Sequence, residues 1–187
     1  WVETSDAADN EIGAFFSGDH RLTNQSTIYA AGRIGGNTIA VTNQGLIVAD
    51  RPTMLTVDPT DTPLDGQPGV VNQGTLRAAD GGTLSLVRGS FANAGGVVEA
   101  LDGSVVELGR AAFLSGGQLS SAGSGVIRSS HDVANTPTDP QVRDLTLTGT
   151  LQVPDGKRLE VAGTLSVSGQ LRLDAASGIA RLVVDSP

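Results

Sequence analysis

The residues best suited to nucleophilic chemistry lie together at Ser129–Asp132, a run that holds serine, histidine and aspartate, the side-chain types of a hydrolase triad. Neighbouring residues of an extended chain point to opposite faces, so this run cannot set a nucleophile against a base and that base against a carboxylate. We expect a solvated loop there, ahead of Pro137, and a turn at Asp19 and His20. The sequence therefore predicts no catalytic residue and no enzymatic activity.

Three aspartates could offer oxygen ligands to calcium: Asp58, Asp61 and Asp65. They lie in a proline-rich stretch, without EF-hand spacing and without a Gly-Gly-x-Gly-x-Asp repeat. They are candidate ligands only, and we predict neither a metal site nor a bound cofactor.

Two further chemistries remain as alternatives. Glycoside cleavage needs two opposed carboxylates, and Glu99 and Glu107 are acids on different stretches of one repeat, so a polysaccharide-binding or polysaccharide-cleaving protein is one alternative. Ice binding needs a flat threonine array, which Thr146 and Thr148 would begin. The position of Thr75 is occupied by leucine or by valine or glycine in neighbouring repeats, which weakens the ice-binding alternative.

Composition narrows the classes of partner. The 187 residues carry a formal charge of −8, which opposes the basic footprint required for nucleic acid or for an anionic membrane surface. Cysteine is absent, which excludes disulfides and thiolate metal sites. No apolar run approaches the roughly 18 residues of a membrane span, so we expect no membrane insertion. The chain opens at Trp1, from which we expect a removed signal peptide or a longer parent protein.

An internal repeat organises most of the chain. The segments LTNQSTIYA, VTNQGLIVA and VVNQGTLRA share one frame, and FANAGGVVEA fits it with one inserted residue. The frame is anchored by Asn24, Asn43, Asn72 and Asn93, with Ser115 in the same place in a fifth segment. Spacings between the anchors are about 20 residues, apart from one that is about ten residues longer.

Within a repeat the hydrophobic period is two. From Val70 to Leu86 the aliphatic residues fall on alternate positions, with Arg, Gln, Thr and Ser between them, which is typical of strands with one buried face. A coil of about 20 residues that holds two or three short strands cannot bury its apolar face alone, so coils must stack. The sequence predicts an all-β fold, a right-handed parallel β-helix of roughly nine coils.

The repeated asparagines have a specific role in that geometry. Side chains of Asn24, Asn43, Asn72 and Asn93 would stack at the spacing of neighbouring strands, where amides can hydrogen-bond to one another along the axis. We expect an inward structural ladder. The alternative is that Asn-Gln-Gly is only a turn sequence.

The chain divides into four parts. We expect residues 1–21 to form an N-terminal cap or lead-in segment, residues 22–128 to form coils with a loop excursion at 51–69, and residues 129–144 to form a loop. Residues 145–187 are predicted as further short-sided coils or a C-terminal cap of hairpins. The cap at the N-terminus would use an apolar plug of Trp1, Ile12, Phe15 and Phe16.

The segment VNQGTLRAADGGTLSL at Val71–Leu86 resembles the repeats of filamentous haemagglutinin-like exoproteins and autotransporter passengers, whose coils read Asn-x-Gly-x-aliphatic-x-Ala. That resemblance implies a bacterial protein that is secreted or displayed on the cell surface, with a role as a stalk, adhesin or fibre component. It implies as partner a host or matrix surface ligand or other copies of the chain, joined as a homo-oligomer through the solenoid ends. No Asn-Pro-Asn secretion motif is present, so no export route is assigned.

Overall fold

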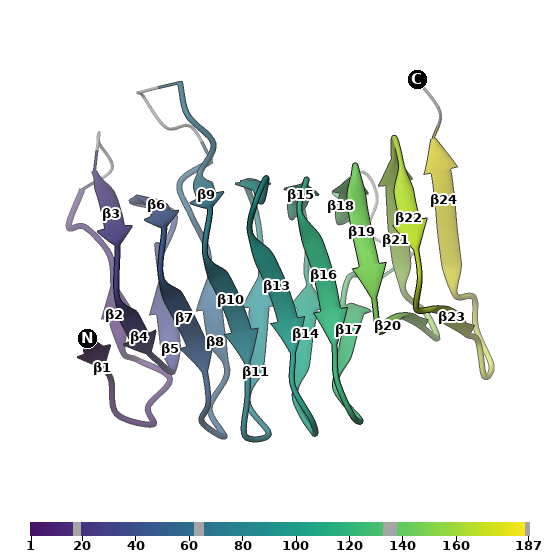
Figure 1. The fold of residues 1–187 in the computed structure, drawn as a ribbon, viewed down its shortest axis with the longest axis horizontal. Helices are drawn as coiled ribbons and strands as arrows, with labels where there is room; N and C mark the ends of the chain where they lie inside the picture. Colours follow the sequence, from purple (N-terminus) through teal and green to yellow (C-terminus); the bar gives the residue numbers. More distant parts are fainter. Residues whose placement is uncertain (17–19, 62–65, 133–137, 186–187) are drawn as a thin grey trace.

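The computed structural model describes residues 1–16, 20–61, 66–132 and 138–185. Across those residues the secondary structure consists of strands and turns, and no helix is long and apolar enough to cross a membrane. Twenty-four strands form three parallel sheets of eight strands each, which run side by side along one elongated body with the two termini at opposite ends (Figure 1).

The three sheets, which we call A, B and C, each take every third strand of the chain. Sheet A consists of β1 (Val2–Glu3), β4 (Thr27–Tyr29), β7 (Leu46–Ala49), β10 (Thr75–Ala78), β13 (Val97–Ala100), β16 (Gln118–Ser121), β19 (Leu145–Thr148) and β22 (Leu165–Val167). Sheet B consists of β2 (Glu11–Ile12), β5 (Gly32–Ile34), β8 (Leu55–Val57), β11 (Thr83–Leu86), β14 (Val105–Leu108), β17 (Val126–Ser129), β20 (Thr150–Pro154) and β23 (Gln170–Asp174). Sheet C consists of β3 (Arg21–Asn24), β6 (Ala40–Asn43), β9 (Val70–Asn72), β12 (Ser90–Ala92), β15 (Phe113–Ser115), β18 (Gln141–Arg143), β21 (Arg158–Ala162) and β24 (Arg181–Asp185).

One strand from each sheet makes one coil, and equivalent strands of successive coils pair in register. Leu76 of β10, for example, lies opposite Ile47 of β7 on one side and Val98 of β13 on the other. The fold is therefore the predicted parallel β-solenoid, with about 8 coils of about 22 residues. The sequence prediction of roughly nine coils was too high because two long connections between sheets B and C add residues without adding strands.

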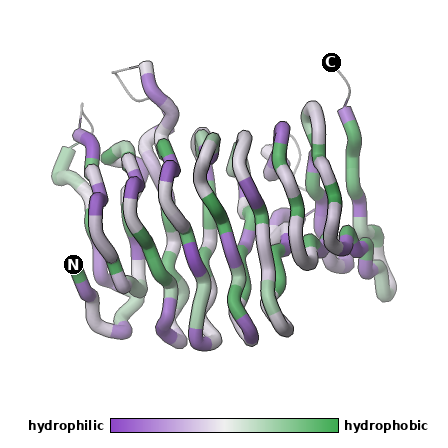
Figure 2. The backbone as a smooth tube through the Cα atoms, in the orientation of Figure 1, coloured by the Kyte–Doolittle hydropathy of each residue, from purple (hydrophilic) through white to green (hydrophobic). Residues whose placement is uncertain are grey.

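Alternation along each strand divides the side chains between core and solvent. Leu76, Leu84 and Phe91, one from each sheet of coil 4, have no exposed surface, while their neighbours Arg77 and Thr83 face outward and are only half-buried. Figure 2 shows the resulting change between hydrophobic and hydrophilic residues along the strands. The predicted period of two is confirmed, and it places one aliphatic core along the interior of the rod.

The small residue after Asn-Gln in the repeat is explained by the corner between sheets C and A. There Ser26, Gly45 and Gly74 stack on one another in successive coils. A Cβ at Gly74 would lie 2.1 Å from the carbonyl oxygen of Gly45, and one at Gly45 would lie 2.0 Å from that of Ser26. The backbones approach so closely that glycine is required, so these glycines serve the stacking of coils.

The first residues belong to the solenoid. β1 pairs with β4 and β2 pairs with β5, so they form coil 1. The predicted plug is wrong for three of its four residues: Trp1 and Phe16 are each 78% exposed and Phe15 is 98% exposed. Only Ile12 packs against the core, because it is the one member of the set that lies on an inward row of a sheet.

The predicted excursion at 51–69 is shorter than expected. It contains β8, whose Leu55 and Val57 are fully buried, so the connection from sheet B to sheet C begins only at Asp58. The predicted loop at 129–144 likewise contains β18, whose Val142 is fully buried. Both strands were missed because each is only three residues long and lies beside proline-rich sequence.

Residues from Leu145 onward continue the same three sheets as coils 7 and 8. The pairings of β19 to β24 with their neighbours are all parallel, so of the two alternatives the structure has coils there and not hairpins. Coil 8 is the last coil that the structure describes, and its inward rows are partly exposed. Val167, Leu173 and Val184 are 45%, 49% and 68% exposed, although the residues before them in the same rows are buried.

Candidate functional site

Two excursions leave the solenoid at the same corner, where the chain passes from sheet B to sheet C. The first, residues 58–69, follows β8 in coil 3, and the second, residues 130–140, follows β17 in coil 6. The first projects beyond the end of the sheets near β9 (Figure 1). Between them, coils 4 and 5 cross the same corner in the short connections 87–89 and 109–112. Short connections flanked by long ones leave a hollow, which we call the corner groove.

The corner groove has a volume of about 460 Å³, which is within the usual range for ligand sites. The first excursion contributes Asp61, the second contributes Thr138, and coils 4 and 5 supply the residues between them: Arg88, Gly89, Ser90, Arg110, Ala111 and Phe113. A second hollow of about 220 Å³ shares Ser90 and Phe113 with it and extends over sheet C to Gln141 and Arg143. Phe113 therefore lies where the two hollows meet.

An ion pair anchors the first excursion to coil 4. The Nε atom of Arg88 donates to Oδ1 of Asp58 at 2.9 Å, and its Nη2 atom donates to Oδ2 of the same carboxylate. The Asp58 side chain is only 2% exposed. Its hydrogen bond raises the pKa of Arg88 further above the ordinary value, so the guanidinium stays charged. Both oxygens of Asp58 are thereby occupied by the cation of Arg88.

The structure describes one of the other two calcium candidates. Asp61 is exposed, and its backbone N–H donates to the side-chain oxygen of Asn37 at 3.1 Å. Asp65 lies outside the described residues. Among the residues that the structure describes, no group of three or more His, Cys, Asp or Glu side chains is placed to hold a metal ion.

Phe113 is an aromatic side chain on the outer face of sheet C. It opens β15, its N–H donates to the carbonyl oxygen of Gly89 at 3.0 Å, and it is 41% exposed. Its register neighbours are Ser90 in coil 4 and Gln141 in coil 6. Phe113 and its neighbour Ser90 both line the corner groove.

Two arginines flank this ring. Arg110 donates from Nε to the hydroxyl oxygen of Thr138 at 3.2 Å, and the next residue, Ala111, donates its N–H to the carbonyl oxygen of Thr138 at 2.8 Å. These bonds tie the second excursion to coil 5. Arg143 is exposed on β18. In the part of the chain that the structure describes, neither Arg110 nor Arg143 has a carboxylate within ion-pair distance.

The serine, histidine and aspartate run at 129–132 does not assemble into a triad. Ser129 donates its hydroxyl hydrogen to the carbonyl oxygen of Arg158, and Asp132 pairs with Lys157 at 2.6 Å. The hydrogen bond and charge of Lys157 lower the pKa of Asp132 below its ordinary value. The expectation of a solvated loop is wrong for His131, which is 7% exposed.

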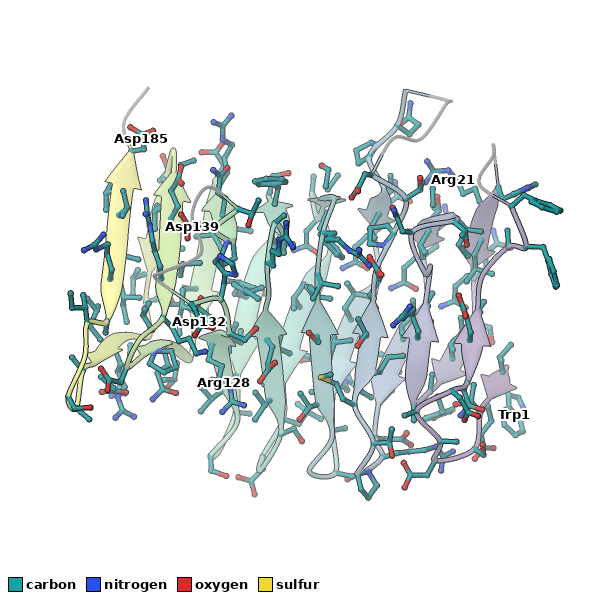
Figure 3. The ribbon with its side chains drawn as sticks, turned by 180° about the vertical axis from the view of Figure 1, so that it is seen from behind. Trp1, Arg21, Arg128, Asp132, Asp139 and Asp185 are labelled. Carbon is teal, nitrogen blue, oxygen red and sulfur yellow. The ribbon has the colours of Figure 1, made fainter. Side chains whose placement is uncertain are left out.

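His131 lies close to the returning half of the second excursion. Asp139 lies on that half, and its Oδ1 is 4.0 Å from Nε2 of His131, while its Oδ2 is 3.1 Å from Nε of Arg158. Figure 3 shows Asp139, Asp132 and Arg128 on the same stretch of the rod, far from Arg21 and Trp1. The cluster joins the excursion to coil 7. The other histidine, His20, is exposed, and its predicted partner in a turn, Asp19, lies outside the described residues.

The acids considered for sugar cleavage are held in separate ion pairs. Glu99 of sheet A pairs with Arg77 at 2.7 Å, and Glu107 of sheet B pairs with Arg128 at 2.6 Å. Because the two carboxylates lie on different sheets and each faces an arginine, they are not an opposed pair.

The threonine positions are also interrupted in register. Thr75 lies between Leu46 and Val97, and Thr146 lies between Gln118 and Ser166, so sheet A has no continuous threonine row.

The four repeat asparagines form one stack at the corner between sheets C and A. The Nδ2 atom of each donates to Oδ1 of the next, at 2.8 Å from Asn24 to Asn43, 2.8 Å from Asn43 to Asn72 and 2.6 Å from Asn72 to Asn93. All four are buried. Asn93 then donates to the carbonyl oxygen of Gly116. The prediction that Ser115 takes the asparagine position is wrong, because the register places Ser115 opposite Ala92 and therefore Gly116 opposite Asn93.

A second amide stack runs outside the first and was not anticipated from the sequence. Gln25 donates to Gln44 at 3.0 Å and Gln44 donates to Gln73 at 3.2 Å, all three being exposed. The sequence did contain the pattern that predicts this stack, because each glutamine directly follows an anchoring asparagine in the repeat frame. The corner groove was also missed, because one sequence does not show that its two insertions fall at the same corner.

Comparison with models of protein families, with curated proteins and with solved structures found no match to the chain.

Proposed function

We propose that this chain is a structural and adhesive β-solenoid segment of a secreted or cell-surface protein, and not an enzyme. The observation that carries the proposal is that two excursions on a continuous three-sheet rod leave it at one corner and border a groove there. Recognition residues are commonly placed on loops that a rigid scaffold positions. The solenoid supplies the scaffold, and the corner supplies the contact surface.

The internal bonding of the rod supports a load-carrying or spacing role. Ladders of backbone hydrogen bonds join every coil to the next in all three sheets, and buried asparagine bonds add a fourth connection through coils 1 to 4 at the corner between sheets C and A. Such a body is stiff along its axis because each coil contacts its neighbours over three strands. The resemblance of the repeat to those of filamentous haemagglutinin-like exoproteins and autotransporter passengers agrees with a stalk or fibre component.

The proposed partner is a ligand on a host or matrix surface, met at the corner groove. Other copies of the chain are the second proposed partner, at the exposed inward rows of coil 8, where Leu173 and Val184 present apolar surface beside unpaired strand edges.

An adhesion assay tests the proposal. Beads coated with the protein are passed over immobilised matrix proteins, acidic and neutral polysaccharides, and the protein itself, and the retained beads are counted. We expect retention on at least one surface, and we expect it to fall when residues 62–66 and 133–137 are both deleted. A matched control carries Arg77→Ala and Glu99→Ala on sheet A, away from the corner, and should be retained like the original protein. Retention no greater than that of albumin-coated beads on every surface would contradict the adhesive role.

A further inference from the structure

We infer that the corner groove binds an anionic polysaccharide, with a sugar ring packed on Phe113 and the acid groups of neighbouring sugars paired with Arg110 and Arg143. The inference rests on the proposed adhesive role, for which it names the class of ligand. Its arguments come from the aromatic ring, from the two cations and from the shape of the hollow.

Phe113 is an exception among the outward residues of its row. Successive coils place Arg21, Ala40, Gly69, Ser90, Phe113, Gln141, Glu160 and Val183 in equivalent positions, so Phe113 is the one aromatic residue in a row of small, polar and aliphatic ones. The ring is 41% exposed, and a ligand that covers it removes apolar surface from water, which favours binding. The apolar face of a sugar ring is a fitting cover, since its hydroxyl groups remain at the rim.

The charges around Phe113 select an acidic ligand. The protein as a whole carries −8, yet the groove and its extension over sheet C hold three arginines against Asp58 and Asp61. Asp58 neutralises Arg88, which leaves Arg110 and Arg143 without a carboxylate partner among the described residues. A carboxylate or sulfate offers the planar or multiple oxygen acceptors that guanidinium binds well. The negative charge of Asp61 repels an acid group at its own side of the corner groove, so the acid groups of the ligand are favoured near Arg110 and Arg143.

The shape of the hollow favours a chain over a single small molecule. The corner groove and the second hollow meet at Phe113, and together they pass from the corner onto the outer face of sheet C. An oligosaccharide could lie along both, with one ring at Phe113 and acid groups on either side. The bonds of Thr138 to Arg110 and Ala111 hold one wall in place before any ligand arrives, which lowers the entropic cost of binding.

The test is direct binding of oligogalacturonate, a carboxylated oligosaccharide, by titration calorimetry at low and high salt. We expect saturable binding that weakens at high salt and that is absent for the methyl-esterified, neutral form of the same sugar. Dextran sulfate distinguishes the sources of negative charge: binding only of the carboxylated sugar or only of the sulfated one identifies the acid group, and binding of both means that the groove accepts either.

The variants separate specific binding from general charge attraction. We expect Phe113→Ser to weaken binding about tenfold, and Arg110→Gln with Arg143→Gln to weaken it at least as much. Serine is already tolerated in the equivalent position of coil 4, so the fold should be retained, which circular dichroism verifies. The matched control is Arg33→Gln with Arg181→Gln, which removes two exposed arginines that line neither hollow and should change the affinity less than about twofold.

Three results would overturn the inference. One is no saturable binding of either acidic polysaccharide, a second is binding that Phe113→Ser leaves unchanged, and a third is tighter binding of polyglutamate, which would point to an acidic peptide. Beads that adhere to another surface while these titrations fail would leave the adhesive role standing and remove only the polysaccharide. Beads that fail on every surface would contradict the adhesive role itself.

Discussion

Replacement of Asn43 by alanine gives the sharpest test of how the coils are held together. Asn43 has no exposed surface, and its side chain makes three hydrogen bonds: one accepted from Asn24 at 2.8 Å, one donated to Asn72 at 2.8 Å and one donated to the carbonyl oxygen of Thr75 at 3.0 Å. Asn24 keeps its bonds to the carbonyl oxygens of Ser26 and Leu46, but Oδ1 of Asn72 is left as a buried acceptor without a donor.

The expected loss follows from these contacts. A net hydrogen bond contributes about 1 kcal/mol, and a buried acceptor left without a partner costs about 1–3 kcal/mol. The variant loses three such bonds and leaves one acceptor unpaired, and the bond to that acceptor must not be counted twice. We therefore expect Asn43→Ala to lower the free energy of unfolding by about 3–5 kcal/mol.

The next residue supplies a matched control. Gln44 also accepts one amide bond and donates another, at 3.0 and 3.2 Å, but it is exposed. Water replaces both partners there, so Gln44→Ala should cost less than about 0.5 kcal/mol. Denaturant unfolding followed by circular dichroism measures both values, and the denaturant slopes must agree before the midpoints are compared. Equal losses for the two variants would refute the argument that burial, and not the amide bonds alone, makes the asparagine ladder stabilising.

Other perturbations test the remaining parts of the fold. Leu84→Asp buries an unpaired charge and should cost more than about 4 kcal/mol in thermal unfolding, whereas Thr83→Asp on the outer face should cost less than about 1 kcal/mol; similar losses would mean that the two faces are reversed. Deletion of residues 62–66 should leave the unfolding transition cooperative, while Asp58→Ala, which leaves Arg88 without its carboxylate, should lower stability by about 2 kcal/mol; a deletion variant that fails to fold would show that the excursion supports the core. Hydrogen bonds from Ser124 hold the pKa of Asp102 below its ordinary value of 3.8, and bonds from Ser177 and Gly178 do the same for Asp155. These contributions are present above pH 3.8 and are lost as the pH falls through the lower pKa of the folded state, so the melting temperature should fall less steeply in acid for Asp102→Asn with Asp155→Asn than for the original protein, and parallel curves would contradict this.

The parts of the fold that the sequence predicts are those that repeat. The shared Asn-Gln-Gly frame placed Asn24, Asn43, Asn72 and Asn93 at equivalent positions, and equivalence in a solenoid means stacking, which is where the structure has them. Period-two alternation likewise identified Leu84 as inward and Thr83 as outward, because each side of a strand meets only core or only solvent.

The parts that could not be predicted depend on where the chain returns. His131 is buried, and its Nε2 lies 4.0 Å from Oδ1 of Asp139 on the far side of the second excursion, yet no local pattern links the two residues. The repeat frame with Ser115 as its anchor aligns Phe113 with the buried Phe91, but the register of β15 places Leu114 opposite Phe91 and Phe113 opposite Ser90, on the outer face. Both cases rest on long-range placement, which a degenerate repeat does not encode in its residue types.

The common corner of the two excursions has a consequence for distance. They leave coils 3 and 6, and since neighbouring strands lie about 4.8 Å apart, their bases are separated by about 14 Å along the axis. Moving either excursion to an adjacent coil would change this separation by one strand spacing and by nothing smaller. The distance between the two loops can therefore change only in steps of one coil, and so can the width of a ligand that fits between them.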